Sequence, residues 1–247
     1  MGSTPNFSNV DPAVSVVVCT KRPNALRNLL ANYTRQTYLN KELLIILNND
    51  RLNPDDYAHA ARDLDQVRIY RLPDQWTLGS CLNFAVKKAR YSLIAKFDDD
   101  DYYAPNYLTD SVRTMRKSGA DVVGKRAHFM VLGSKPSLLF RYPSQRNRFV
   151  RLVQGATLLV RKHVFDQVAF PDRNRGECVK FCAACRARGF RIYAGSPYHF
   201  LALRRKNSRN HTWIVSDKKL LTRNVRVLRV KRIIPFISRG QVSLNRE

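Results

Sequence analysis

Four short apolar runs alternate with helical patterns in the first part of the chain, and this alternation constrains the fold more than any other feature. The run over residues 14–19 is continuous and rich in β-branched side chains, which is typical of a strand buried on both faces. Further apolar runs occupy residues 43–47, 67–70 and 93–97. Between the runs, helical patterns begin near Pro23, Asn53 and Gly79. This order predicts an α/β fold with a doubly wound, mainly parallel sheet.

The second half of the chain is less regular but continues the alternation. Helices are predicted over residues 106–117 and 178–188, the second ended by Gly189. Further strands are predicted over residues 121–123, 127–132, 157–160 and 191–193. No internal repeat or low-complexity linker divides the sequence. We therefore expect a flexible N-terminus over residues 1–12, one domain over 13–215 and a basic amphipathic C-terminal extension over 216–247.

Four consecutive aspartates, Asp98, Asp99, Asp100 and Asp101, follow the fourth apolar run directly. Adjacent carboxylates repel one another, and a hard divalent cation that also binds phosphate oxygens would supply the missing counter-charge. Thr20 and the pair Asn48 and Asn49 also follow predicted strands. Ligands of open α/β sheets bind beyond the carboxyl ends of the strands. The sequence therefore predicts a polar site at this edge, with a solvated acidic turn as the alternative.

The composition adds a strong positive charge. The 247 residues include 44 Lys and Arg against 19 Asp and Glu, a formal net charge of +25, and 44% of the residues are hydrophobic. Such a charge favours polyanionic partners: nucleic acid, an acidic membrane surface or phosphorylated substrates. The sequence has no zinc-finger spacing, helix-turn-helix pattern or aromatic-rich RNA signature, so we expect no specific nucleic acid.

Cysteine usage and hydropathy bear on the compartment. The cysteine count is odd, which suggests reduced thiols in a cytosolic protein. Cys178, Cys182 and Cys185 share one face of a predicted helix, where core positions are favoured over a metal site. The sequence has neither a leader peptide nor an apolar run of about 18 residues. We expect a cytoplasmic protein.

The C-terminal segment is cationic and amphipathic. From Lys218 to Arg239, basic residues alternate with leucine, valine and isoleucine. This pattern suits peripheral contact with an anionic membrane at its inner face. The alternative is that the segment packs on the domain as a solvated charged helix or strand.

The order and spacing of the motifs resemble those of a family 2 glycosyltransferase of the GT-A fold, over roughly residues 14–213. Several segments carry the resemblance: the opening strand at Val14–Thr20, Gln36-Thr37-Tyr38 with the strand after it, the G-x-x-x-N turn from Gly79 to Asn83, the D-x-D of Asp98 and Asp100, Gly176-Glu177, and His211-Thr212-Trp213. The resemblance implies a GT-A domain with a Rossmann-like nucleotide-binding half and a nucleotide-sugar donor of the UDP or dTDP type.

The resemblance also implies site residues. Asp100 would ligate Mn²⁺ or Mg²⁺, with His211 as a further ligand or a phosphate contact, and Asp98 would reach the ribose or a metal-bound water. A histidine ligand would suit Mn²⁺ better. The donor would bind among residues that follow the strands or open the third helix: Thr20, Arg22, Asn48, Asn49, Gly79, Asn83, Asp98 and Asp99. Trp76 and Trp213 either stack on the acceptor sugar or are buried aromatics.

One position departs from the family pattern. The family commonly reads Glu-Asp where this chain has Glu177-Cys178, and the family's Asp is the general base. A thiol is a poor substitute for a carboxylate at neutral pH. We favour Glu177 as the catalytic base; Asp172 is an alternative, and an impaired enzyme is another.

The function expected from these features is a metal-dependent, inverting glycosyltransferase. It would move a sugar from a nucleotide-diphosphate donor to a glycan or lipid-linked acceptor in bacterial surface polysaccharide synthesis. Two other readings are a catalytically impaired, glycosyltransferase-like nucleotide-binding protein and, less favoured, a basic nucleic-acid-binding protein.

Overall fold

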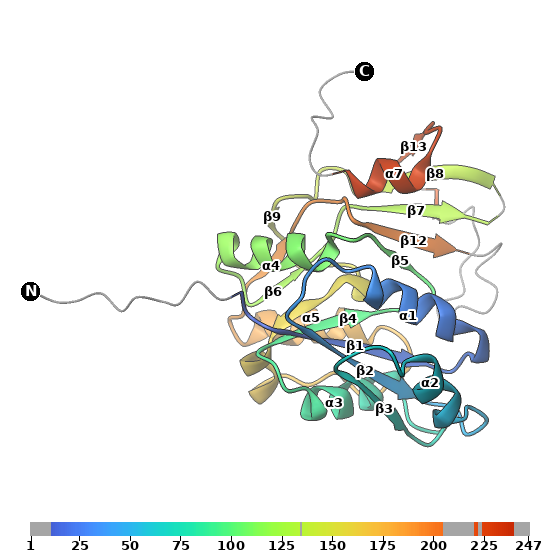
Figure 1. Cartoon of the computed structure of the whole chain (residues 1–247). Helices are drawn as coiled ribbons and strands as arrows, with labels where there is room; N and C mark the ends of the chain where they lie inside the picture. Colours follow the sequence, from blue (N-terminus) through green and yellow to red (C-terminus); the bar gives the residue numbers. More distant parts are fainter. Residues whose placement is uncertain (1–10, 134, 205–219, 222–223, 240–247) are drawn as a thin grey trace, which may run out of the picture.

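An eight-stranded sheet lies at the centre of the structure, with its strands in the order β3-β2-β1-β4-β10-β6-β11-β9 (Figure 1). The computed structural model describes residues 11–133, 135–204, 220–221 and 224–239. The first four strands along the chain are β1 (Val14–Thr20), β2 (Lys41–Leu47), β3 (Val67–Arg71) and β4 (Leu93–Phe97). β1 pairs in parallel with β2 and β4, and β2 pairs in parallel with β3. These pairings confirm the predicted α/β fold.

The other half of this sheet mixes strand directions. It contains β6 (Val122–Gly124), β9 (Arg148–Phe149), β10 (Leu159–Arg161) and β11 (Ile192–Ala194). β10 runs antiparallel to β4 and β6, whereas β11 runs parallel to β6. The two residues of β9 are exposed, so they carry no apolar pattern from which a strand could be predicted.

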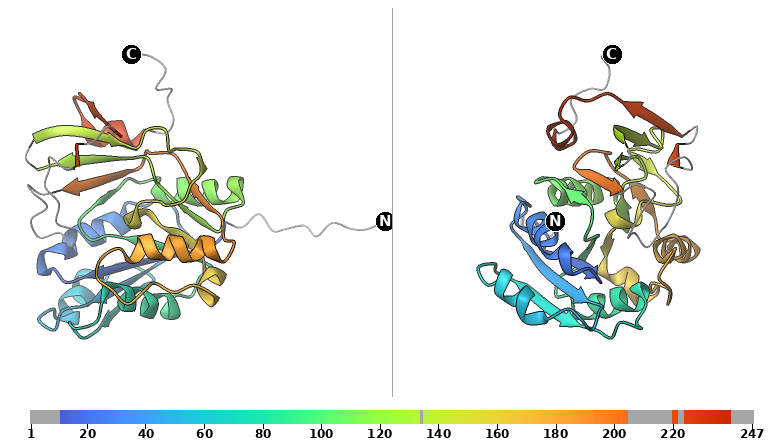
Figure 2. Two further views of the ribbon diagram at one scale, coloured as in Figure 1. Left: turned by 180° about the vertical axis from the view of Figure 1, so that it is seen from behind. Right: turned by 90° about the vertical axis from the view of Figure 1, so that its right-hand side faces the viewer.

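Helices cover both faces of the central sheet. They are α1 (Leu26–Thr34), α2 (Pro54–Ala60), α3 (Leu78–Lys88), α4 (Tyr107–Ser118) and α5 (Glu177–Ala187), with 3₁₀ turns at Pro23–Ala25, Gly155–Thr157 and Lys162–Asp166. Alternate residues of β2 enter two cores: Leu43 and Ile45 pack with α1 and α4, and Leu44 and Ile46 pack with α3 and α5. Figure 2 shows α5 facing the viewer once the molecule is turned by 180°.

The cysteines of α5 lie in the second of these cores. Cys178, Cys182 and Cys185 are buried, and all five cysteines of the chain are free thiols. Burial raises the pKa of Cys182 to about 11 and that of Cys185 to about 12. These thiols are therefore protonated at neutral pH, and the prediction that they are core residues is confirmed.

A second sheet of five strands packs beyond α4, in the order β13-β8-β7-β12-β5 (Figure 1). Its strands are β5 (Tyr102–Tyr103), β7 (His128–Leu132), β8 (Lys135–Arg141), β12 (Phe200–Arg204) and β13 (Val225–Leu228). Met130 and Phe200 face the core shared with α1 and α4. Phe129 and Phe140 face the opposite way, toward α7 (Ile233–Ser238). Only β7 was predicted from the sequence.

The described part of the predicted C-terminal extension belongs to this second sheet. β13 pairs antiparallel with β8, and Ile237 of α7 is fully buried against β7. Residues 224–239 therefore pack on the domain, as in the alternative considered above, and the boundary at residue 216 stays a prediction. Within the described ranges, no helix is long and apolar enough to span a bilayer.

A buried carboxylate fixes the starts of β1 and β2. Glu42 is fully buried and accepts hydrogen bonds from Ser15 Oγ at 2.5 Å and the Arg90 backbone N–H at 2.7 Å, and it pairs with Arg68 Nη2 at 2.6 Å. Burial alone would raise the pKa of Glu42, but these three partners outweigh burial and lower it. The ionised carboxylate is therefore part of the folded structure.

We expect Glu42→Gln to destabilise the fold at neutral pH by about 1–3 kcal/mol, because Arg68 loses its charged partner. A lowered pKa in the folded state means that Glu42 contributes stability above its unfolded pKa, near 4.5, and loses it as the pH falls through the folded value. Urea unfolding should therefore show the wild type and the variant converging in acid. Asp63→Asn, at an exposed position, should change stability by less than about 0.5 kcal/mol.

Candidate functional site

The carboxyl ends of β1 and β4 bring Thr20 and Arg22 against the aspartates. β1 and β4 are adjacent parallel strands, with Val18 opposite Phe97, so the residues that follow each strand meet at one edge. Thr20 Oγ1 donates a hydrogen bond to Asp99 Oδ2 at 2.5 Å. The Arg22 guanidinium forms ion pairs with Asp99 and, at 3.0 Å, with Asp100 Oδ2. The predicted convergence of polar groups at this edge is confirmed.

Helix α1 holds the backbone of the aspartate turn. Asn28 Nδ2 donates to the carbonyl oxygens of Asp99 and Asp101, at 2.9 and 3.1 Å. Asn32 Nδ2 donates to the Asp101 carbonyl at 2.8 Å, and its Oδ1 accepts from the Tyr103 N–H. The sequence interpretation missed both asparagines. Their signal is an i, i+4 pair of amides on a helix that is otherwise apolar toward the core.

The four aspartates have different surroundings. Asp98 forms an ion pair with Lys96. Burial raises the pKa of Asp99 to about 6, although Arg22 and the Thr20 hydroxyl act in the opposite direction. Burial and the charges of Asp100 and Asp98 also raise the pKa of Asp101, whose Oδ1 accepts the Leu203 N–H at 3.0 Å. Burial, together with repulsion from neighbouring carboxylates, thus holds the pKa of Asp99 and of Asp101 above the usual range.

Three of these carboxylates could hold one metal ion. Among the described residues, the oxygens of Asp98, Asp100 and Asp101 lie within 4.8 Å of one another. Hard divalent cations take oxygen ligands of this kind, and such an ion would offset the repulsion between adjacent carboxylates. The cluster therefore fits Mn²⁺ or Mg²⁺. His211 lies outside the described residues, so its place as a further ligand stays a prediction.

A cavity of about 320 Å³ opens beside the aspartates. Asp99 and Asp100 line it together with Arg22 and Asn28, and the ends of β7 and β12 close its other side through Val131, Gly133, Leu203 and Arg204. The second sheet thus completes a hollow that contains carboxylates and two arginines. Such a mixture suits a phosphate group bridged to a divalent cation.

The asparagines after β2 lie at the same edge but have protein partners. Asn48 is buried, and its Nδ2 donates to the Pro73 carbonyl at 2.6 Å. Asn49 Nδ2 donates to the Lys21 carbonyl at 2.8 Å. These amides tie together the loops that follow β1, β2 and β3. Their predicted contact with a nucleobase stays a prediction.

Gly79 and Asn83 of α3 dock against the segment before α5. A Cβ at Gly79 would lie 1.9 Å from the Pro171 carbonyl oxygen, so only glycine permits this approach. Asn83 Nδ2 donates to the Phe170 carbonyl at 2.8 Å and its Oδ1 accepts the Phe170 N–H at 2.9 Å. Both residues were expected to bind donor, and in this structure they position the segment that leads to Glu177.

Asp172 also holds the segment before α5 against α3. Its Oδ1 accepts hydrogen bonds from Thr77 Oγ1 at 2.5 Å and Ser80 Oγ at 2.7 Å, at the start of α3. These two bonds lower the pKa of Asp172. A carboxylate with a lowered pKa, held at a helix N-terminus, is a weaker proton acceptor.

Glu177 is the first residue of α5, and its side chain is mostly buried. Gly176 before it has a φ of 71°, a left-handed conformation that favours glycine. Glu177 Oε1 accepts a hydrogen bond from Cys178 Sγ at 3.2 Å. Of the two tryptophans, Trp76 is partly exposed beside Phe84, and Trp213 lies outside the described residues.

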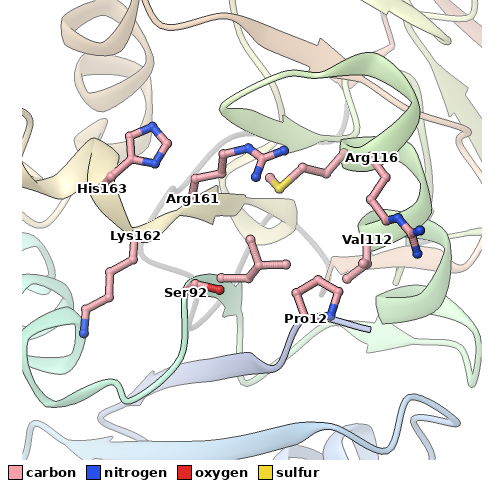
Figure 3. A pocket seen from close by; sticks show the side chains of 9 residues that line it. Pro12, Ser92, Val112, Arg116, Arg161, Lys162 and His163 are labelled. Carbon is pink, nitrogen blue, oxygen red and sulfur yellow. The ribbon is translucent and has the colours of Figure 1, made fainter. Parts of the chain in front are cut away.

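A second hollow, of about 210 Å³, lies at the opposite edge of the sheet (Figure 3). Pro12 precedes β1, Ser92 precedes β4 and Leu93 is its first residue, so this hollow is remote from the carboxyl ends of these strands. Two cations on its rim have partners: Arg116 pairs with Asp11 at 3.0 Å, and Lys162 Nζ donates to the Ala89 carbonyl at 2.6 Å. It is separate from the aspartate site.

Solved structures share this fold. The S. aureus protein TarS (residues 1–349), in complex with UDP-GlcNAc, matches with a TM-score of 0.64 and 16% identity, over 78% of this chain and 59% of that one. The mannosyltransferase PcManGT from Pyrobaculum calidifontis, in complex with GDP-Man and Mn²⁺, matches with a TM-score of 0.63 and 15% identity, over 82% of this chain and 59% of that one.

Sequence comparisons add a curated relative and a family. The O-antigen biosynthesis glycosyltransferase WbnJ of Escherichia coli is 32% identical over 114 residues, which cover 45% of this chain and 44% of the relative. The chain thus matches less than half the length of this relative. The family model described as Glycosyl transferase family 2 matches residues 15–161, more than half of the chain. The chain therefore belongs to glycosyl transferase family 2.

Proposed function

We propose that this protein transfers a sugar from a nucleotide-diphosphate donor to a glycan or lipid-linked acceptor in surface polysaccharide synthesis. The observation that carries the proposal is the carboxylate cluster of Asp98, Asp100 and Asp101 beside a cavity lined by Arg22 and Arg204. TarS in complex with UDP-GlcNAc and PcManGT in complex with GDP-Man share the fold, and WbnJ supports a role in polysaccharide synthesis.

In this proposal the donor diphosphate lies beside the aspartates. Asp100, with Asp98 and Asp101, would hold Mn²⁺ or Mg²⁺, and the bound ion would neutralise charge on the diphosphate as the nucleotide leaves. Arg22 contributes a further positive charge at the same place, because its guanidinium already contacts Asp100 at 3.0 Å. The nucleobase, of the uracil or thymine type, would bind beyond β1 and β2 near Thr20 and Asn49.

Glu177 is the base in this proposal. In an inverting displacement the acceptor oxygen forms a bond to the anomeric carbon as the bond from that carbon to the phosphate oxygen breaks. The acceptor hydroxyl then loses its proton, which Glu177 would take. Its burial at the start of α5 supports this role, and the hydrogen bonds that occupy Asp172 disfavour the alternative.

Asp100→Asn tests the metal role. We expect the variant to lose the Mn²⁺-dependent thermal stabilisation by UDP or dTDP, because the cation loses an anionic ligand. The melting temperature without ligands should hardly change, since Asp100 is partly exposed. Asp63→Asn, an exposed carboxylate outside the site, should bind as the wild type does. Equal binding of nucleotide by the wild type in EDTA and in Mn²⁺ would contradict the metal role.

Glu177→Gln tests the base. Turnover of the nucleotide sugar should fall by about 10²–10⁴, with little change in donor affinity, because the amide cannot take a proton. Cys178→Asp should preserve or raise turnover, since it restores the family's acid. Asp172→Asn is the matched comparison and should lower turnover much less. A fully active Glu177→Gln would place the base elsewhere, and a wild type that binds donor without turnover would indicate an impaired enzyme.

We further propose that the C-terminal segment contacts an anionic membrane at the inner face. Residues 224–239 contain no acidic residue. Five basic side chains in this segment are exposed: Arg226, Arg229, Lys231, Arg232 and Arg239. Val227 and Ile234 are also exposed and would reach the interfacial region of the bilayer. Each basic residue near such a surface contributes about 1 kcal/mol.

Vesicle sedimentation tests this contact. The protein should bind vesicles containing phosphatidylglycerol and leave them at high salt, because screening weakens the attraction. Replacement of Arg226, Arg229, Lys231 and Arg232 by Ala should weaken binding at least about tenfold. The control replaces four exposed residues in α3 or beside α2, namely Arg51, Arg62, Lys87 and Lys88. These two helices lie at the other end of the molecule from α7 (Figure 1). Equal binding by the two variants would show that only net charge matters.

A further inference from the structure

Lys96 is a buried cation in the strand that leads into the aspartates. Its side chain is 6% exposed, and it forms an ion pair with Asp98. The alternation of β4 places Ala95 and Phe97 in the core of α1 and α4, whereas Ile94 enters the core of α3 and α5. Lys96, two residues after Ile94, therefore projects toward the face that α5 covers. A lysine is almost never buried without a partner, so its position calls for an explanation.

The start of α5 packs against the same segment as Lys96. The Lys96 N–H donates to the Leu158 carbonyl at 2.9 Å, and a Cβ at Gly155 would lie 2.8 Å from Cys178 Sγ. The segment from Gly155 to Leu158 is thus in contact with both β4 and the first turn of α5. Cys178 Sγ in turn donates to Glu177 Oε1. These contacts bring the first turn of α5, which carries Glu177, against the segment that is bonded to Lys96.

The charges in this region attract one another. Burial acts to lower the pKa of Lys96, but Asp98, Cys178 and Glu177 outweigh burial and raise it. The ion pair with Asp98 explains how a charged ammonium group can be buried here, and a second carboxylate attracts it from a greater distance. The first carboxylate, Asp98, is at the end of β4, and the second is Glu177, at the start of α5.

We propose that Lys96 is a positioning residue that fixes Glu177 relative to Asp98 and so aligns the acceptor side of the site with the donor side. This inference rests on the proposed role of Glu177 as the base. Lys96 also shares Asp98 with any bound divalent cation, because its ammonium group contacts the Asp98 carboxylate directly. The loss of Lys96 should therefore impair turnover without weakening the metal site.

Lys96→Met gives two readouts with opposite expectations. Turnover, measured as nucleotide diphosphate release from the best UDP-, dTDP- or GDP-linked hexose, should fall about 10–100-fold with little change in KM. Affinity for Mn²⁺ alone, measured by calorimetry, should stay equal or rise, because a competing positive charge has been removed. Lys96→Arg, which keeps the charge, should recover most of the turnover. Weaker Mn²⁺ binding by a folded Lys96→Met would overturn the inference.

A double-mutant cycle tests the link to Glu177. If Lys96 acts through Glu177, Lys96→Met should lower the turnover rate of the Glu177→Gln variant only slightly. The same double-mutant cycle, measured as the free energy of unfolding in urea, needs no substrate and should also show coupling between Lys96 and Glu177. Independent effects in both cycles would overturn the inference. A fully active Glu177→Gln would instead refute the proposed base.

Lys125 provides the matched control. It is an equally buried lysine, paired with Asp110 at 3.3 Å and bonded to the Ser196 carbonyl at 2.6 Å. Lys125→Met should destabilise the fold without any coupling to Glu177. If Lys96→Met does not fold, Lys96→Gln and Lys96→Arg take its place in both cycles. Coupling of Lys125→Met to Glu177 as strong as that of Lys96 would overturn the specific role of Lys96.

Discussion

Four adjacent carboxylates at the end of a buried strand are the constraint on which the rest of the site depends. Charges this close cannot all be ionised without compensation. Arg22, from the loop after β1, and Lys96, within β4, supply two cations. Asn28 and Asn32 hold the backbone of the turn from α1. The elements around the turn are thus arranged by its need for counter-charges and hydrogen-bond donors.

The second sheet supplies a hydrogen-bond donor and an arginine to the aspartate turn, and it also packs against its own core. The backbone of β12 reaches Asp101 through the Leu203 N–H, and Arg204 follows at the rim of the cavity. On its other side this sheet has its own small core with α7, which contains Phe129 and Ile237. One layer thus closes the cavity beside the aspartates and also carries the exposed basic C-terminal segment.

Residues that resemble donor-binding motifs position the segment that leads to the proposed base. Gly79 and Asn83 hold the segment from Phe170 to Arg173 against α3, and Asp172 is bonded at the start of the same helix. That segment leads directly to Glu177. The turn and helix of this motif therefore stabilise the region from which the proposed base projects.

The sequence by itself determined the order of the first strands and helices, and it placed Thr20 and the aspartates at strand ends. Periodic burial and strong local propensities suffice for that, because each pattern lies within about ten residues. The tertiary structure decided which distant residues contact the aspartates. Asn28 meets Asp101 across 73 residues, and Leu203 meets it across 102. β12 exists as a strand through pairing with β7, which lies far from it in the sequence, and no local pattern encodes that choice. Which cation compensates which carboxylate follows from that packing alone.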